Sequence, residues 1–229
     1  MNTKFMALVA TLAIAKSSAA YVIDFEDLSA GTIVDNEYSA QGVVISALNF
    51  DNNLDLAVIF DTENPTGGDH DLGGPFTAGP DNDLGSIAPG NVLILQENDN
   101  CDALSCTTPD DEGSRPGGQF IIEFDQAVSL NSIDFFDVEV LETDPAESNR
   151  ISLFDANGDL IALDFFTPNT GGDNQWARAF FGVDGVSRIE INMGGSGAID
   201  NIDVTVVPVP AALPLFLAAL GGLGFMRKR

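Results

Sequence analysis

Between Tyr21 and Val206 the chain consists of short apolar runs separated by glycine, proline, asparagine and aspartate. Several runs alternate apolar and polar residues, as at Phe120, Ile122 and Phe124, which share one face of an extended segment. That period of two is typical of half-buried β-strands, and no internal window sustains the period of a long amphipathic helix. The predicted strands span residues 21–25, 42–50, 56–60, 91–97, 118–125, 130–140, 150–155, 159–166, 175–181, 186–193 and 198–206.

The number and spacing of these runs predict an all-β fold. About ten strands joined by frequent turns are typical of an antiparallel β-sandwich, and we expect a jelly-roll-like one over residues 21–206. Asn157 and Gly158 separate the runs that end at Phe154 and begin at Leu160, which predicts a β-hairpin. Two segments, 61–90 and 98–118, interrupt the pattern; they are rich in glycine and proline, contain no predicted strand, and have a length that is usually functional or disordered.

The first twenty residues have the features of a secretory signal peptide. Lys4 precedes an apolar core over residues 5–15, and Ser18, Ala19 and Ala20 supply the small residues at which cleavage occurs. We therefore expect an exported protein. A buried helix is the alternative, which the lack of an amphipathic stripe disfavours.

Export makes the two cysteines interpretable, because disulfides persist in oxidising compartments. Cys101 and Cys106 lie close together in a loop-like stretch and are predicted to form a disulfide that closes a small loop. A zinc centre is disfavoured, because it needs more thiolates or histidines and His70 is the only histidine.

The chain ends in an apolar segment followed by Arg227, Lys228 and Arg229. Residues 211–226 carry no charge, which predicts a C-terminal transmembrane helix slightly shorter than the usual span of about 20 residues. Because basic flanks stay in the cytoplasm, residues 21–205 are expected on the outer side of the membrane.

The order of proline motif, apolar helix and basic cluster in residues 207–229 resembles the PEP-CTERM sorting signal of bacteria that make exopolysaccharide. The motif here is Val207-Pro208-Val209-Pro210 followed by Ala211, similar to a Val-Pro-x-Pro-Ala variant of the usual Val-Pro-Glu-Pro. The resemblance implies transient anchoring in the cytoplasmic membrane. It also implies recognition and cleavage by an exosortase-type membrane protease, with release or attachment at the cell surface.

Acidic residues dominate the predicted domain. All 35 aspartates and glutamates lie there, against four arginines, Arg115, Arg150, Arg178 and Arg188. A surface this negative repels nucleic acid and attracts cations, so binding to DNA or RNA is excluded. The acidity has two compatible interpretations: a coat that keeps the protein soluble, or carboxylate clusters that bind Ca²⁺.

Acidic side chains are concentrated in the segment 61–90. The pattern Asp-x-Asp-x-Gly occurs twice there, and paired carboxylates beside glycine suit a loop that wraps a hard cation such as Ca²⁺. Neither copy completes an EF-hand, and a solvated flexible loop is the alternative. The candidate calcium ligands of this segment are Asp61, Asp69, Asp71, Asp81 and Asp83.

A second candidate calcium pair joins the two ends of the domain. Asp200 and Ile202 are two residues apart in the same predicted strand, so strict alternation places both side chains on the buried face. A buried carboxylate needs a compensating charge. First and last strands of a jelly roll often pair, which would bring Glu26 close to Asp200. Residues 25–46 and 195–206 are similar to the ends of jelly-roll domains of the carbohydrate-binding-module type, and the resemblance implies a structural Ca²⁺ bound by Glu26 and Asp200. A capping or turn role is the alternative.

Aromatic residues bear on sugar binding. Trp176 is the only tryptophan and lies beside a Gly/Asn/Asp-rich stretch and Arg178, so these two residues are the candidate sugar contacts. Packing of Trp176 in the core is the alternative.

No catalytic motif is present in the sequence: a phosphate loop, a dinucleotide fingerprint and HExxH are all missing. Glycoside hydrolysis requires two carboxylates, and a chain with 35 acidic residues meets this requirement whether or not it is a glycosidase. We expect a calcium-stabilised, non-enzymatic protein of the cell surface or extracellular matrix that binds or structurally supports exopolysaccharide. The alternative is a surface glycoside hydrolase or polysaccharide lyase.

Overall fold

The structure is a computed structural model, and it describes residues 19–50, 52–79, 84–111, 117–139 and 146–207. The predicted signal peptide, apart from its last two residues, lies outside the described residues, as do the predicted transmembrane helix and the sorting motif after Val207. Residues Ala20–Val207 form one compact unit. Within the described ranges, no helix has the length and apolar character needed to cross a membrane.

The described chain is all-β, as the sequence predicts. Two pairs of neighbouring predicted runs each form one continuous strand, β6 and β9. The segment 61–90, predicted to lack strands, contains the two-residue strand β4. The strands are β1 (Ala20–Ile23), β2 (Val43–Asn49), β3 (Ala57–Asp61), β4 (Thr77–Ala78), β5 (Asn91–Leu95), β6 (Gly118–Phe136), β7 (Arg150–Phe154), β8 (Leu160–Phe166), β9 (Gln175–Met193) and β10 (Ala198–Val206), with short 3-10 helices η1 (Ser39–Gln41) and η3 (Ala146–Asn149).

The strands form one sheet in the order β3-β5-β10-β6-β9-β7-β8, with β1 added to β10 and β2 added to β6. These pairings are antiparallel, while β4 pairs with β9 in parallel. The predicted hairpin is confirmed: β7 and β8 pair across a turn in which the Asp155 N–H donates to the Asp159 carbonyl over 2.9 Å.

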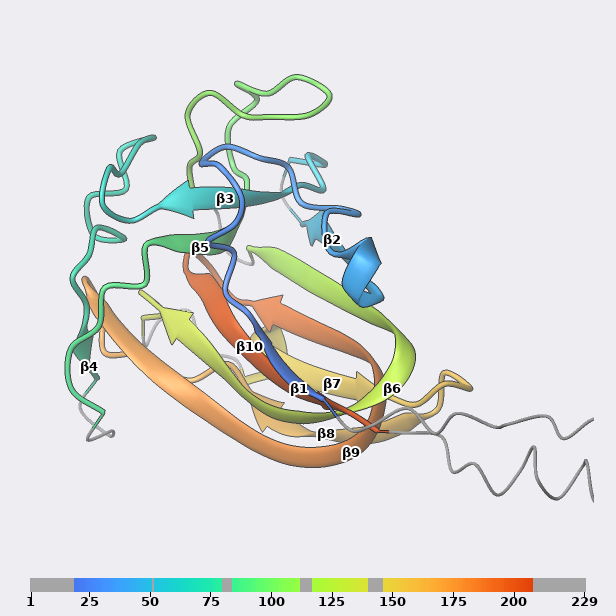
Figure 1. Ribbon diagram of the computed structural model, residues 1–229. Coiled ribbons are helices and arrows are strands. Elements are labelled where there is room, and N and C mark those ends of the chain that lie inside the picture. The colour runs from blue at the N-terminus through green and yellow to red at the C-terminus, as the bar shows by residue number, and fades with distance from the viewer. Residues whose placement is uncertain (1–18, 51, 80–83, 112–116, 140–145, 208–229) are drawn as a thin grey trace, which may run out of the picture. The chain divides into compact units, whose positions relative to one another are not determined.

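The sheet folds over because β6 and β9 are long and curved (Figure 1). Residues 118–124 of β6 pair with β2, whereas residues 128–136 pair with β10. Register shifts interrupt the β6–β9 ladder between these two parts, and such irregularities allow a strand to bend. We call β2, β7, β8 and the adjoining parts of β6 and β9 the open layer. We call β1, β3, β5, β10 and the other parts of β6 and β9 the covered layer.

The main core lies between the two layers. It contains side chains from the inner face of each, and this packing of one layer on the other gives a sandwich-like fold. The open layer contributes Val43, Ile45, Phe120, Ile122, Ile151, Leu153, Ile189 and Ile191, and the covered layer contributes Ile59, Leu93, Ile133, Phe135 and Ile199.

A second apolar core lies on the outer face of the covered layer. Phe136 belongs to it, whereas the preceding Phe135 points into the main core. Leu72 and Phe76 from the segment 61–90 and Cys106 from the segment 98–111 pack against this face. The long glycine-rich segments therefore cover the layer; Figure 1 shows the chain between β3 and β5 running along one side of the sheet to β4 and back.

Candidate functional site

A row of polar residues crosses the outer face of the covered layer. The strand register places Asp200 of β10 opposite Asp134 of β6, and Asp134 opposite Arg178 of β9. Both aspartates are buried, with 1% of Asp200 and none of Asp134 exposed. Two buried carboxylates side by side with one cation leave a local excess of negative charge.

Asp134 and Arg178 form a two-pronged ion pair. The Arg178 Nε donates to Asp134 Oδ1 over 2.5 Å and Nη2 donates to Oδ2 over 2.7 Å. The hydrogen bond to Asp134 raises the pKa of Arg178. Arg178 thus compensates Asp134, and Asp200 needs another partner.

Asp200 is only partly satisfied by the protein. Its Oδ2 accepts a hydrogen bond from Asn201 Nδ2 over 2.8 Å, but its buried Oδ1 has no hydrogen-bond partner. Burial raises the pKa of the Asp200 carboxyl to about 9, and the charges of Asp134, Asp24 and Glu26 add to the effect. The site therefore requires a proton or a cation at Asp200.

Glu26 is brought to this site by the pairing of the first and last strands, as the sequence predicts. It is exposed, as is Asp24, and both carboxylates are close enough to raise the pKa of Asp200. Glu26 Oε1 accepts the N–H of Asn91 over 2.8 Å. Gly90 makes room for this carboxylate, because a Cβ there would lie 2.5 Å from Glu26 Oε1.

The alternation of apolar and polar residues correctly predicts that the Asp200 side chain is buried, but it places that side chain on the wrong face of the strand. Ile199 and Ile202 both point into the main core although they are three residues apart. The alternation is broken by a register shift between Asp200 and Asp203, next to Asn201 with a φ of 49°. Asp200 therefore lies on the outer face of its layer, opposite to Ile202.

In the described part of the segment 61–90, the predicted ligands Asp61, Asp69 and Asp71 are not gathered around a common point. Asp61 closes its own turn by accepting hydrogen bonds from the Glu63 N–H and Asn64 Nδ2. Asp69 is fully buried, whereas Asp71 lies at the surface. Asp81 and Asp83 lie outside the described residues.

Asp69 belongs to a buried carboxylate cluster that the sequence analysis missed. Its Oδ2 accepts the N–H of Asp111 over 2.9 Å, and Asp111 Oδ2 in turn accepts the N–H of Gly197 over 2.8 Å. Burial, followed by the charges of Asp69 and Asp137, raises the pKa of Asp111 well above its usual value. The cluster ties both covering segments to the sheet, and no local pattern around Asp111 indicates it.

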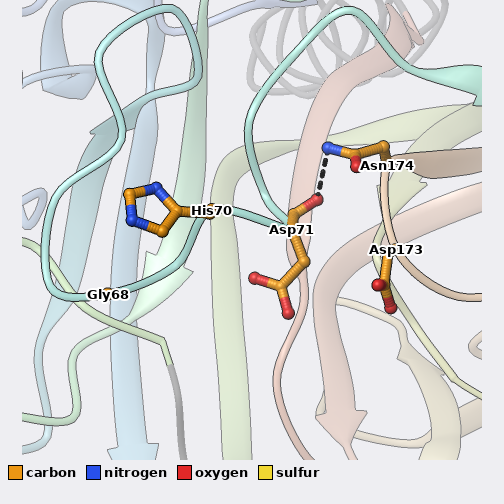
Figure 2. Close-up of a pocket in the computed structure, with 5 residues that line it drawn as sticks. All are labelled: Gly68, His70, Asp71, Asp173 and Asn174. Carbon is orange, nitrogen blue, oxygen red and sulfur yellow. Dashed lines mark hydrogen bonds between the residues drawn. The ribbon is translucent and has the colours of Figure 1, made fainter.

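Asp71 lines a polar surface hollow of about 340 Å³ together with Gly68, His70, Asp173 and Asn174. Figure 2 shows the carboxylates of Asp71 and Asp173 pointing to the same side of the hollow. Asn174 Nδ2 donates to the Asp71 carbonyl over 2.8 Å, which fixes the loop. The hollow is open, and its lining contains no Phe, Tyr or Trp side chain.

Trp176 lies in the second core, which corrects its assignment as a sugar contact. The side chain is 2% exposed, its Nε1 donates to the Gly85 carbonyl over 2.9 Å, and its ring stacks on Phe136. The Arg178 guanidinium lies 5.6 Å from the ring centroid. A ring buried in this way offers no face on which a pyranose could stack. The alternative interpretation, packing of Trp176 in the core, is the one that the structure shows.

Cys101 and Cys106 form the disulfide that the sequence predicts. Cys106 is buried in the second core and Cys101 packs against it, so the disulfide closes the loop around the exposed Leu104 at its anchor on this core. Among the described residues, no three His, Cys, Asp or Glu side chains are already arranged around a common point that would hold a metal ion.

No known protein family matches the chain. A search of curated proteins likewise found no relative.

Proposed function

We propose that the protein is an exported component of the cell surface or extracellular matrix whose jelly-roll-like β-sandwich is stabilised by calcium. The observation that carries this proposal is the buried Oδ1 of Asp200, which has no hydrogen-bond partner. A buried carboxylate must be neutralised by a proton or by a cation. The neighbouring acids Asp24 and Glu26 make the site still more negative, and their carboxylate oxygens are further ligands that a metal ion, unlike a proton, can use.

The donor set also fits calcium. Asp200 and Glu26 offer carboxylate oxygens, and no sulfur or imidazole lies among the residues that shift the pKa of Asp200. Calcium takes six to eight oxygen ligands, including main-chain carbonyls and water, and tolerates irregular geometry. The proposed ion would join β10 to the turn after β1, and so would hold the first and last strands together.

Thermal unfolding of the full-length chain, measured in calcium and in chelator, tests the site. Saturation at a hundredfold excess over Kd adds about 2.7 kcal/mol of stability, which raises Tm by roughly 5–10 °C for a domain of this size. The Asp200→Asn variant should lose this shift. Asp203→Asn is the matched control on the same strand, because Asp203 has its own donor in Asn131 Nδ2. Equal melting temperatures of the wild type in calcium and chelator would remove calcium from the proposal.

The export and sorting parts rest on the sequence of residues 1–20 and 207–229, and the disulfide is compatible with an oxidising compartment. An exosortase-type membrane protease is the proposed processing partner. Mass spectrometry of the surface fraction should find a product that begins after Ala20 and ends near Pro210. A full-length product with an intact leader in the cytosol would contradict export.

A further inference from the structure

The outer face of the open layer carries a row of four side chains from four strands. The register aligns Val44 of β2 with Glu123 of β6, Glu123 with Arg188 of β9, and Arg188 with Phe154 of β7. All four side chains are half-buried or exposed. Unlike the row that contains Asp134 and Asp200, this row is accessible to solvent.

Arg188 is held in place within this row. Its guanidinium carbon lies 4.2 Å from the centroid of the Phe154 ring, and its Nη2 is 2.9 Å from Glu190 Oε1. The side chain is 36% exposed. Stacking and ion pairing reduce the freedom of a long side chain, so its remaining donors are pre-organised for a ligand.

The row lies along a groove made of two adjoining hollows. The larger, of about 360 Å³, is lined in part by Glu123, Asp125, Phe154, Asp155 and Arg188. The smaller, of about 290 Å³, shares Glu123 and Asp125 with it and extends the groove past Val44 of β2. The groove thus crosses β2, β6, β9 and β7.

The lining selects a chemical class of ligand. The carboxylates of Glu123 and Asp125 can accept hydrogen bonds, whereas that of Asp155 already accepts those of its own turn. The Arg188 guanidinium can donate, and the Phe154 ring provides an apolar surface. A ligand that fits must donate and accept hydrogen bonds and also present an apolar C–H face. The excess of carboxylates, in a chain of net charge −26, repels anionic polymers.

We propose that this groove binds a neutral, polyhydroxylated chain, that is, an uncharged glycan, with Phe154 and Arg188 at its centre. The inference extends the proposed surface function by naming a ligand class. It does not depend on calcium, because Asp200 belongs to the covered layer.

Affinity electrophoresis of the full-length chain in nonionic detergent tests the groove. Native gels contain either a neutral polysaccharide, taken from a panel of β-glucan, mannan, galactan and xylan, or the polyuronate alginate. At least one neutral polysaccharide should retard the wild type, and alginate should not. Phe154→Ala and Glu123→Ala should each weaken retardation at least tenfold.

The matched control is Phe180→Ala, because Phe180 is 68% exposed on the covered layer and lies outside the groove. Its retardation should equal that of the wild type. Glu123 is exposed, so Glu123→Ala keeps the test valid even if Phe154→Ala melts early. Absence of retardation by every neutral glycan, retardation by alginate alone, or equal loss in Phe180→Ala would overturn the inference. The gels are run both in calcium and in chelator, so that failure of glycan binding can be distinguished from failure of the calcium site. The melting experiment reports the calcium site independently.

Discussion

The open and covered layers share β6 and β9 but differ on their outer faces. In the covered layer, both faces are buried along β3 except at Asp61, along β5 except at Asn91, and along residues 132–136 of β6. In the open layer, β7 alternates strictly between buried and half-buried residues. The covering segments remove water from the part of one outer face that holds the second core, whereas the other outer face keeps charged and aromatic side chains in contact with solvent.

This difference changes the energetics of chemically similar groups. Each layer has an aspartate or glutamate paired with an arginine that also contacts an aromatic ring: Asp134 with Arg178, and Glu190 with Arg188. The carboxylate is fully buried in the first pair and 23% exposed in the second. Removal of one partner of a buried ion pair lowers the stability of the fold, whereas the groups of an exposed pair contribute little to stability and can contact a ligand.

The largest expected effect compares aromatic residues on the two outer faces. Trp176→Ala should lower the free energy of unfolding by about 3–5 kcal/mol, because it empties the second core. Phe166→Ala on the open layer should cost less than about 1 kcal/mol, since Phe166 is 42% exposed. Urea unfolding measures both. Equal losses would show that the covering segments do not make a true core.

The two ion pairs provide the second comparison. Asp134→Ala leaves Arg178 without its partner at a partly buried site and should cost about 3–5 kcal/mol. Glu190→Ala should change stability by about 1 kcal/mol or less. Urea unfolding at low and high salt measures these losses. A salt-sensitive Asp134 pair would contradict the burial seen for it.

Reduction of the disulfide tests the covering segment itself. A closed loop this short is worth about 2 kcal/mol by chain entropy. Reduction leaves Cys106 in its apolar contacts, so the loss should not exceed this value. Melting with and without a thiol-free reductant measures it, and Leu104→Ser, at a 79% exposed loop position, is the neutral control. Global unfolding on reduction would contradict the expectation.

The buried acid Asp111 should give the covered layer a pH dependence. Its folded-state pKa is raised, so its contribution to stability is complete below the unfolded value near 4 and is lost as pH rises above it. One proton corresponds to at most about 1.4 kcal/mol per pH unit. Asp111→Asn should flatten the slope of unfolding free energy against pH. An unaltered slope in this variant would exclude Asp111 as the titrating group.

Much of the fold could be predicted from the sequence because strand periodicity is local. The runs containing Ile122 and Ile189 form strands with the predicted buried faces. The covering role of the segment 61–90 could not be predicted, because its anchors, Leu72 and Phe76, follow no period. The calcium candidates differ in the same way. Pairing of β1 with β10 brings Glu26 near Asp200, whereas Asp61, Asp69 and Asp71 form no common site among the described residues.

The sequence by itself determined the strand content, the hairpin and the strong negative charge of the domain, since each depends on neighbouring residues or on composition alone. Only the tertiary structure decided which face each charged residue occupies. A single bulge beside Asn201 reverses the parity of Asp200, and the covering segments bury Trp176. Those outcomes depend on contacts between residues far apart in the chain, and the physical cost of burying a charge or an aromatic ring is set by what covers it.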